Sequence, residues 1–308
     1  MEKLLITSYV NADIDGVAGI FAYSEFLEKI GVNNTIGVMG KIHDEAKYVL
    51  NRFNFEYPQI ILNSNDFDEV VLIDTSDLNG VEGNIELAKV VEIIDHRKIY
   101  EADKFLNAKV QIELVGSAST LITEKFIEKN IEISKKSAIL LLSAIISNTS
   151  NFKGSVTTDR DRKSAKYLNK IALLPDNYWK ELFEAKSDLS GDKLFNRITG
   201  DLSSYFIGNK KFSIAQIEII GVEQLIKERE KEIIEILNKI KEKDTLDFIF
   251  LSAIDLEKER TYFISNNENT KNLLKKILNV DFNENIAFIN KIIMRKQIVP
   301  LLKEELEK

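Results

Sequence analysis

Residues 70–74 (VVLID) and 90–95 (VVEIID) are two short apolar runs that each end in an aspartate. Runs that are apolar at nearly every position are typical of strands buried on both faces of a parallel sheet. A β-rich run at 3–9 (KLLITSY), followed by helical apolar spacing over 16–30, shows the same alternation of strand and helix. The pattern predicts an α/β fold with an open, mainly parallel sheet in the first half of the chain.

The second half of the chain has a different pattern. The polar segment 188–193 (DLSGDK) is the best candidate for a linker, so we predict a first domain over 1–187 and a smaller C-terminal α/β domain over 194–308. In the second domain, the apolar spacing predicts strands at 212–220, 247–253, 261–265 and 291–294, and helices at 222–243, 272–278 and after Pro300.

Composition excludes several classes of function. The chain has 308 residues, a formal net charge of −7 and no cysteine, so disulfides, thiolate metal sites and cysteine nucleophiles are ruled out. The negative net charge argues against general nucleic-acid binding but permits a small phosphate ligand held by a metal or a few local cations. No apolar run approaches the roughly 20 residues that span a bilayer, and the N-terminus turns acidic too soon for a signal peptide. We therefore expect a cytoplasmic protein with no membrane partner.

Acidic residues and one histidine follow the predicted strands. Asp13 and Asp15 come after the first strand, Asp74 ends another strand, and His96 follows a third. In a parallel sheet these ends lie along one edge, where ligands bind, and carboxylates gathered there need a cation to offset their repulsion. Carboxylates and an imidazole suit Mg²⁺ or Mn²⁺. The alternative is that these aspartates cap helices, as Asp15 could do just before Gly16.

The same residues belong to a series of motifs that resembles the DHH phosphoesterase superfamily. The matching segments are, in chain order, NADID (11–15), LID (72–74), DHR (95–97), LVGSAST (114–120), SNTSNFK (147–153), GNKKFSIAQIE (208–218) and RKQIVP (295–300). The last two look like the second type of DHH-associated domain. The series spans nearly the whole chain and is most similar to manganese-dependent (family II) inorganic pyrophosphatases, whereas the DHR variant also occurs in the prune-like branch.

The resemblance implies a metal-dependent phosphohydrolase with its active site in the cleft between two domains. It implies two Mn²⁺ (or Mg²⁺) ions, a metal-activated water and a small phosphoanhydride substrate, either pyrophosphate or polyphosphate. It also implies a homodimer through the sheet of the first domain. By position, the implied metal ligands are Asp13, Asp15, Asp74 (as the bridge), His96 and Asn148. The implied catalytic residues are Asp13, Asp15, Asp74, His96 and Arg97, and the implied phosphate-binding residues are Arg97, Arg295 and Lys296.

Several positions depart from the family's pattern, three of them at the predicted metal and phosphate ligands. Tyr9 stands where the family has a histidine ligand, and Asn148 stands where it has an aspartate. A phenol, with a pKa near 10, is a poor ligand at neutral pH, and an amide carries no charge. Arg97 replaces the second histidine of DHH and can grip a phosphate but cannot act as a general acid. These departures leave two alternatives open: a prune-like nucleotide phosphodiesterase, and a non-catalytic relative that binds a phosphorylated ligand.

Overall fold

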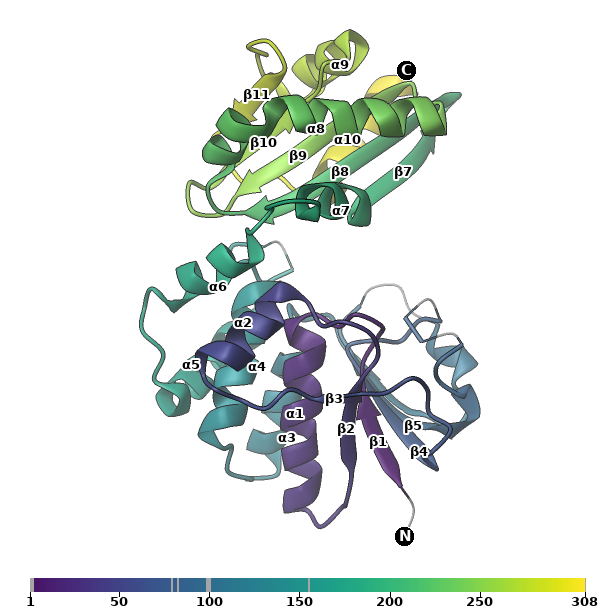
Figure 1. Cartoon of the computed structure of the whole chain (residues 1–308), viewed down its shortest axis with the longest axis vertical. Helices are drawn as coiled ribbons and strands as arrows, with labels where there is room; N and C mark the ends of the chain where they lie inside the picture. Colours follow the sequence, from purple (N-terminus) through teal and green to yellow (C-terminus); the bar gives the residue numbers. More distant parts are fainter. Residues whose placement is uncertain (1–2, 79, 82, 98–100, 155, 308) are drawn as a thin grey trace. The chain divides into compact units, whose positions relative to one another are not determined.

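The chain forms two compact units in the computed structural model, one ending at Ala185 and one beginning at Lys186 (Figure 1). The segment predicted as a linker, 188–193, lies at the start of the second unit. The structure describes residues 3–78, 80–81, 83–97, 101–154 and 156–307. Within these ranges, no helix has the length and apolar character needed to cross a membrane.

The first unit is built on a six-stranded sheet in which all neighbouring strands are parallel. The strand order is β3-β2-β1-β4-β5-β6, so the order reverses between β1 and β4. Open α/β sheets bind ligands outside the carboxyl ends of the strands at such a reversal. The predicted open parallel sheet is confirmed. Its strands are β1 (Leu4–Thr7), β2 (Thr35–Val38), β3 (Gln59–Ile60), β4 (Glu69–Ile73), β5 (Val90–Asp95) and β6 (Lys109–Ile112).

Both faces of this sheet are covered. Helix α1 packs against β1, β4, α3 and α4 on one face (Figure 1). Its close approach depends on Gly19, because a Cβ there would lie 2.3 Å from Cγ2 of Ile73. On the other face, Leu72 and Ile93 pack with residues of the connecting segments such as Phe105. Two covered faces explain why β4 and β5 are apolar at nearly every position.

The helices of the first unit are α1 (Ile14–Lys29), α2 (Asp44–Arg52), α3 (Ala118–Glu128), α4 (Lys135–Asn148), α5 (Asp159–Ala172) and α6 (Tyr178–Lys186), with 3₁₀ turns η1 (Leu87–Lys89) and η2 (Ala102–Lys104).

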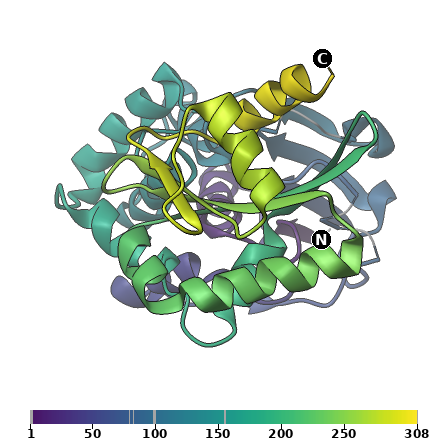
Figure 2. The same ribbon diagram turned by 90° about the horizontal axis from the view of Figure 1, so that it is seen from above.

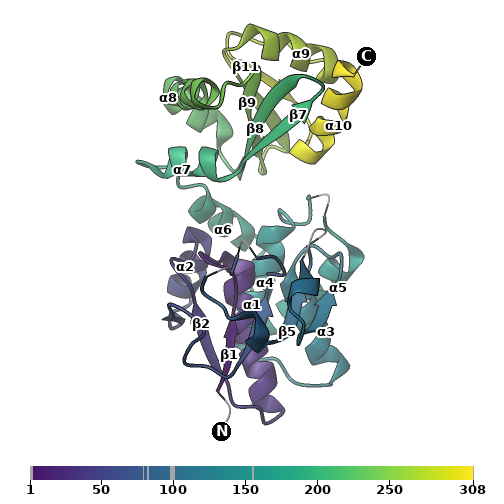
Figure 3. The same ribbon diagram turned by 90° about the vertical axis from the view of Figure 1, so that its right-hand side faces the viewer.

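The second unit is a mixed sheet with helices on both faces, which confirms the predicted smaller α/β domain. Its strand order is β11-β10-β9-β8-β7; β8 and β9 are parallel and the other neighbours are antiparallel. Helix α8 covers one face, and α9 and α10 cover the other (Figures 2 and 3). The elements are β7 (Leu202–Ile207), β8 (Lys210–Ile219), β9 (Phe248–Asp255), β10 (Arg260–Ile264), β11 (Ile286–Ile289), α7 (Lys193–Gly200), α8 (Val222–Asp244), α9 (Glu268–Leu278) and α10 (Arg295–Leu306).

Two sequence predictions near the C-terminus are wrong. The strand expected at 291–294 is a loop, and the last strand is β11, at Ile286–Ile289. The loop buries Ile293, and its backbone bonds to a side chain: the Thr261 hydroxyl donates to the carbonyl of Lys291 and accepts from the backbone N–H of Ile293. Helix α10 begins before Pro300, at Arg295, where the Gln297 side chain accepts from the backbone N–H just outside the helix. That bond satisfies the backbone N–H of Met294 at the start of the helix.

Candidate metal centre

Three segments of the chain converge at the carboxyl edge of the first sheet. Asp15 lies in the first turn of α1, Asp74 directly follows β4, and His96 directly follows β5. Because β4 pairs in parallel with both β1 and β5, these strand ends are neighbours. One ligand atom from each of Asp15, Asp74 and His96 lies within 4.8 Å of the other two. The structure thus brings together three of the five predicted metal ligands.

The Asp15 carboxylate is fully buried and accepts hydrogen bonds from the start of α3. Its donors are the hydroxyls of Ser117 and Ser119, at 2.8 and 2.6 Å, and the backbone N–H groups of Ala118 and Ser119, at 2.8 and 3.0 Å. The predicted alternative that Asp15 caps α1 is therefore wrong, because Asp13 caps α1 instead. The glycine-bearing motif at 114–120 fixes the carboxylate of Asp15 in place.

Asp74 and His96 face each other across this cluster. Nε2 of His96 lies 3.3 Å from Oδ1 of Asp74 and 3.6 Å from Oδ2 of Asp15. The other ring nitrogen, Nδ1, lies 3.0 Å from the carbonyl oxygen of Val115. A proton on Nδ1 directed at that carbonyl leaves the Nε2 lone pair for a metal. Asp74 has a φ of 59°, a left-handed conformation found at functional sites more often than elsewhere.

Burial and charge shift the pKa values of these groups. Burial, followed by the charge of Asp15, raises the pKa of the Asp74 carboxyl well above its usual range. Burial opposes the charge of the His96 imidazole, but the carboxylates of Asp74 and Asp15 outweigh it and raise the pKa of His96 to about 10. The protonated imidazole thus supplies the positive charge that offsets the carboxylates. A divalent ion that bound here would displace the imidazole proton and supply that positive charge instead.

Asp13 and Tyr9 lie near Asp74, since the charges of both aspartates act on the Tyr9 phenol. Oδ1 of Asp13 accepts from the backbone N–H groups of Asp15, at 2.8 Å, and Gly16, at 3.2 Å. The backbone N–H of Asp13 donates to the Tyr9 phenol at 3.1 Å. Burial, together with the charges of Asp13 and Asp74, raises the pKa of Tyr9 far above its usual value of 10. This part of the cluster therefore offers a neutral phenol and a carboxylate engaged in capping a helix.

Arg97 is held by partners within the first unit. Its guanidinium donates to the Asp77 carboxylate at 2.5 Å and to the backbone carbonyl of Asp74 at 2.8 Å. It lies 3.5 Å from the Asp95 carboxylate, and its central carbon lies 5.3 Å from the centroid of the Tyr9 ring. The side chain predicted to bind phosphate is thus a fixed cation stacked on the Tyr9 ring.

Asn148, at the end of α4, reaches the cluster as a hydrogen-bond donor. Its Nδ2 donates to Oδ2 of Asp15 at 2.7 Å, and that same oxygen faces His96. An amide can satisfy Asp15 here without a metal, whereas an aspartate would add a second carboxylate that repels it. Asparagine at this position therefore adds no negative charge that would attract an ion.

The two predicted phosphate-binding residues of the second unit begin α10. The Arg295 guanidinium donates to the backbone carbonyls of Asp201 and Ile214 and, at 2.7 Å, to the Asp201 carboxylate. Lys296 is exposed and makes no ion pair or hydrogen bond with any residue that the structure describes. Of the two cations, Lys296 is the one available to an anion in solution.

Sequence reasoning missed two carboxylates that support the cluster. Asp161 is fully buried and accepts from the Gly116 backbone N–H, at 2.9 and 3.0 Å, and from the Thr120 hydroxyl at 2.6 Å. It therefore fixes the turn that carries the donors to Asp15. The sequence feature that marks Asp161 is the capping box at the start of α5, where Thr158 and Asp161 bond reciprocally. Glu45 in α2 is buried and accepts from the Ser147 hydroxyl at 2.7 Å, and no local pattern marks it.

A divalent cation fits the chemistry of this cluster. Two buried carboxylates and one imidazole nitrogen converge, and such a donor set suits Mn²⁺. The hydroxyl of Thr75, directly after Asp74, is buried and has no hydrogen-bond partner among the described residues, as expected of a group that meets a ligand or water. The fold and the cluster together define an α/β protein with a candidate metal centre at the carboxyl edge of its parallel sheet.

Comparison with known proteins agrees with this class. The family model described as the DHH family, N-terminal domain, matches residues 3–145, and the DHHA2 domain model matches residues 180–305. The chain is 31% identical to the manganese-dependent inorganic pyrophosphatase of Bacillus subtilis over 98% of each protein. It is 32% identical to a Clostridium acetobutylicum protein named "Probable manganese-dependent inorganic pyrophosphatase", over 100% of this chain and 99% of that protein.

A solved structure from Methanococcus jannaschii, provisionally named a family II inorganic pyrophosphatase, is similar over 99% of this chain and 100% of its own, with a TM-score of 0.70 and 27% identity. The chain belongs to the DHH family, in the group that carries a DHHA2 domain. Within that family it resembles the manganese-dependent inorganic pyrophosphatases.

Proposed function

We propose that this protein is a manganese-dependent hydrolase of phosphoric anhydrides and that inorganic pyrophosphate is its substrate. The observation that carries the proposal is the convergence of Asp15, Asp74 and His96 at the strand reversal of a DHH chain. Full-length similarity to relatives named manganese-dependent inorganic pyrophosphatases supports the choice of metal and substrate.

Each residue of the centre has a proposed role. Asp15, Asp74 and His96 hold the ion, with Asp74 positioned by the strained turn after β4. An ion bound there supplies Lewis acidity, which lowers the pKa of water and neutralises charge on phosphoryl oxygens. Asp13 orients the start of α1, which carries Asp15. The buried carboxylate of Asp95 accepts from the His96 backbone N–H at 2.7 Å and so positions the ligand rather than binding the ion.

The second unit carries the two cations, Arg295 and Lys296, that the family resemblance implies for phosphate binding. Lys296 is exposed, and its ammonium is available to an anion. Arg295 is tied to the Asp201 carboxylate and to the carbonyls of Asp201 and Ile214, so it holds the start of α10, from which Lys296 extends. Arg97 is tied to Asp77 in the same way, and it keeps a permanent positive charge beside Asp74.

We propose that one Mn²⁺ ion binds tightly, in place of the two that the resemblance implies. The position beyond Asp74 presents the Tyr9 phenol, whose oxygen already accepts from the Asp13 backbone N–H. The Arg97 guanidinium stacks on the same ring, and a second dication would meet its charge. The centre among Asp15, Asp74 and His96 keeps the implied ligands, and it departs from the family's pattern only in that Asn148 carries no negative charge.

Phosphate release in the presence of Mn²⁺ tests the proposed activity. The full chain should release phosphate from pyrophosphate faster than from tripolyphosphate or a dinucleotide, and His96→Gln should abolish the reaction because it removes a metal ligand. Faster release from tripolyphosphate would assign an exopolyphosphatase-like activity, and faster cleavage of the dinucleotide would assign the prune-like activity. Absence of release from all three substrates at any Mn²⁺ concentration would refute hydrolysis.

One observation favours a second candidate, a relative that binds a phosphorylated ligand without hydrolysing it. Asn148 satisfies Asp15 without a metal, and His96 already supplies a positive charge to the cluster. Such a protein would bind pyrophosphate in the absence of Mn²⁺. Calorimetric titration with pyrophosphate, with and without Mn²⁺, separates the two: a metal requirement for binding favours the enzyme.

The proposed assembly is a homodimer in the cytoplasm, acting on a small phosphate-containing substrate. Leu106, Val110 and Leu114 support the dimer, since they are 90%, 42% and 66% exposed at or beside the edge strand β6. An apolar strand edge is a common site for pairing between copies. Light scattering on the wild type and on Val110→Lys tests the assembly, with a shift from dimer to monomer expected for the variant.

A further inference from the structure

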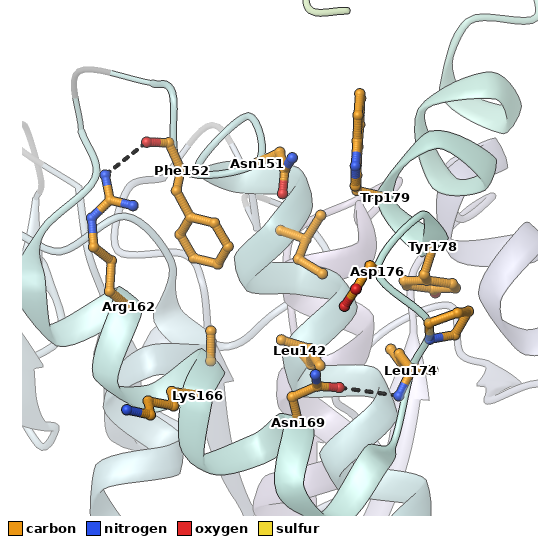
Figure 4. Close-up of a pocket in the computed structure, with 13 residues that line it drawn as sticks. Leu142, Asn151, Phe152, Arg162, Lys166, Asn169, Leu174, Asp176, Tyr178 and Trp179 are labelled. Carbon is orange, nitrogen blue, oxygen red and sulfur yellow. Dashed lines mark hydrogen bonds between the residues drawn. The ribbon is translucent and has the colours of Figure 1, made fainter.

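The first unit contains a cavity that shares no residue with the metal centre. Its volume is about 380 Å³, within the range of small-molecule sites. Buried apolar side chains of α4 and α5, including Leu142, Ile146 and Ala165, line its inner part. The Phe152 ring lies on one side and Trp179 on the other (Figure 4). The cavity can therefore accept a planar apolar group between aromatic walls.

Cations surround this cavity in a chain that is otherwise acidic. Arg162 and Lys166 of α5 line it, and both are exposed. The ammonium groups of Lys153 and Lys180 lie 5.4 and 5.7 Å from the centroid of the Trp179 ring. Asp176 is the carboxylate that lines the cavity. Among the charged residues that line the cavity, two are cations and one is a carboxylate, so its lining carries a net positive charge in a chain with a net charge of −7 and can attract an anion.

The turn that carries Phe152 is strained. Ser150, Asn151 and Phe152 have φ values of 50°, 52° and 65°, so three successive residues other than glycine are left-handed. Such conformations persist only where surrounding contacts enforce them, and they gather at ligand sites. Here Nη2 of Arg162 donates to the Phe152 carbonyl at 2.9 Å, and its guanidinium carbon lies 5.5 Å from the Phe152 ring centroid. The turn thus holds an aromatic face and a cation together at the cavity.

We propose that this cavity binds a nucleotide, with the base between the aromatic side chains and the phosphates at Arg162 and Lys166. Stacking on a tryptophan or phenylalanine ring suits any base, and guanidinium and ammonium groups bind phosphate. Inorganic phosphate would leave the apolar walls unused, and an uncharged aromatic molecule would leave the cations unused. The site is separate from the metal centre and goes beyond the hydrolysis proposed there.

Trp179 provides a direct probe, because it is the only tryptophan of the chain. Titration of the full-length protein with ADP should change its fluorescence in a saturable way and give a matching calorimetric isotherm. In EDTA, adenosine, which lacks phosphate, and pyrophosphate, which lacks a base, should each change the Trp179 fluorescence with an affinity at least about tenfold weaker than that of ADP. Absence of a saturable fluorescence change with ADP, or an equal fluorescence response to pyrophosphate, would overturn the proposal.

Charge variants on α5 locate the site. Arg162→Ala/Lys166→Ala should weaken ADP binding at least about tenfold, whereas Lys163→Ala/Lys170→Ala should leave it unchanged. Both pairs remove two exposed cations from the same helix, but Lys163 and Lys170 do not line the cavity. His96→Gln should bind ADP as the wild type does. Equal affinity of the two double variants, or loss of ADP binding in His96→Gln, would refute the cavity as the nucleotide site.

Discussion

Replacement of Asn148 by aspartate should make the protein less stable without metal and a stronger binder of Mn²⁺. The Asn148 amide now donates to the buried Asp15 carboxylate at 2.7 Å. A carboxylate in its place turns that attraction into repulsion between like charges about 4 Å apart, worth about 4 kcal/mol at an effective dielectric constant of about 20. Protonation or rotation of the new carboxyl relieves part of this, so we expect a loss of about 1–3 kcal/mol in the free energy of unfolding.

The same charge should strengthen metal binding, because it faces a dication once Mn²⁺ is present. Each 1.4 kcal/mol recovered corresponds to a tenfold lower Kd, so Asn148→Asp should lower the Kd for Mn²⁺ by about one to two orders of magnitude. Calorimetric unfolding with EDTA and with Mn²⁺, together with Mn²⁺ titration, measures both effects. Asn177→Asp is the matched control, since that amide is exposed in the same unit and should change neither quantity. An unchanged Kd in Asn148→Asp would refute the placement of residue 148 at the ion.

Three further predictions concern the ligands and their support. Because the pKa of His96 is raised to about 10, Mn²⁺ must displace the proton of the imidazole at any pH below that value. The affinity for Mn²⁺ should therefore rise with pH from neutrality and level off near pH 10. Calorimetry in two buffers should show the release of this proton on Mn²⁺ binding, and His96→Gln should remove that release. Gly116→Ala should lower the free energy of unfolding by about 1–3 kcal/mol, since its Cβ would lie 2.6 Å from Cγ2 of Thr149. Gly200→Ala is the control and should leave the free energy of unfolding unchanged, because the space around Gly200 is open. Equal denaturation midpoints for the two variants would contradict the packing argument. Tyr9→His should raise the Mn²⁺ stoichiometry from one to two ions per chain, giving a coupled paramagnetic resonance spectrum; an unchanged stoichiometry would show that the phenol does not limit the second position.

The first sheet could be predicted because its signals are local. The runs ending at Asp74 and Asp95 are apolar on both faces, and only a sheet with both faces covered requires that pattern. The C-terminal segment was predicted less well. Its apolar residues at 291–294 enter the core from a loop, and sequence periodicity does not distinguish such a loop from a short strand.

The metal centre was only partly accessible from the sequence. Strand ends in a parallel sheet place Asp15, Asp74 and His96 together by topology alone, so position along the chain was enough to predict that these side chains converge. The roles of Asp13 and Asn148 depend on side-chain direction. Whether a carboxylate caps a helix or an amide donates to a neighbour is decided by tertiary contacts that no residue pattern records.

The most direct test of the account is anomalous diffraction at the manganese edge from crystals grown with Mn²⁺. The account predicts an anomalous peak about 2 Å from carboxylate oxygens of Asp15 and Asp74 and from Nε2 of His96, and no second peak of equal strength beside Tyr9. A strong peak elsewhere in the chain, with none among Asp15, Asp74 and His96, would contradict it.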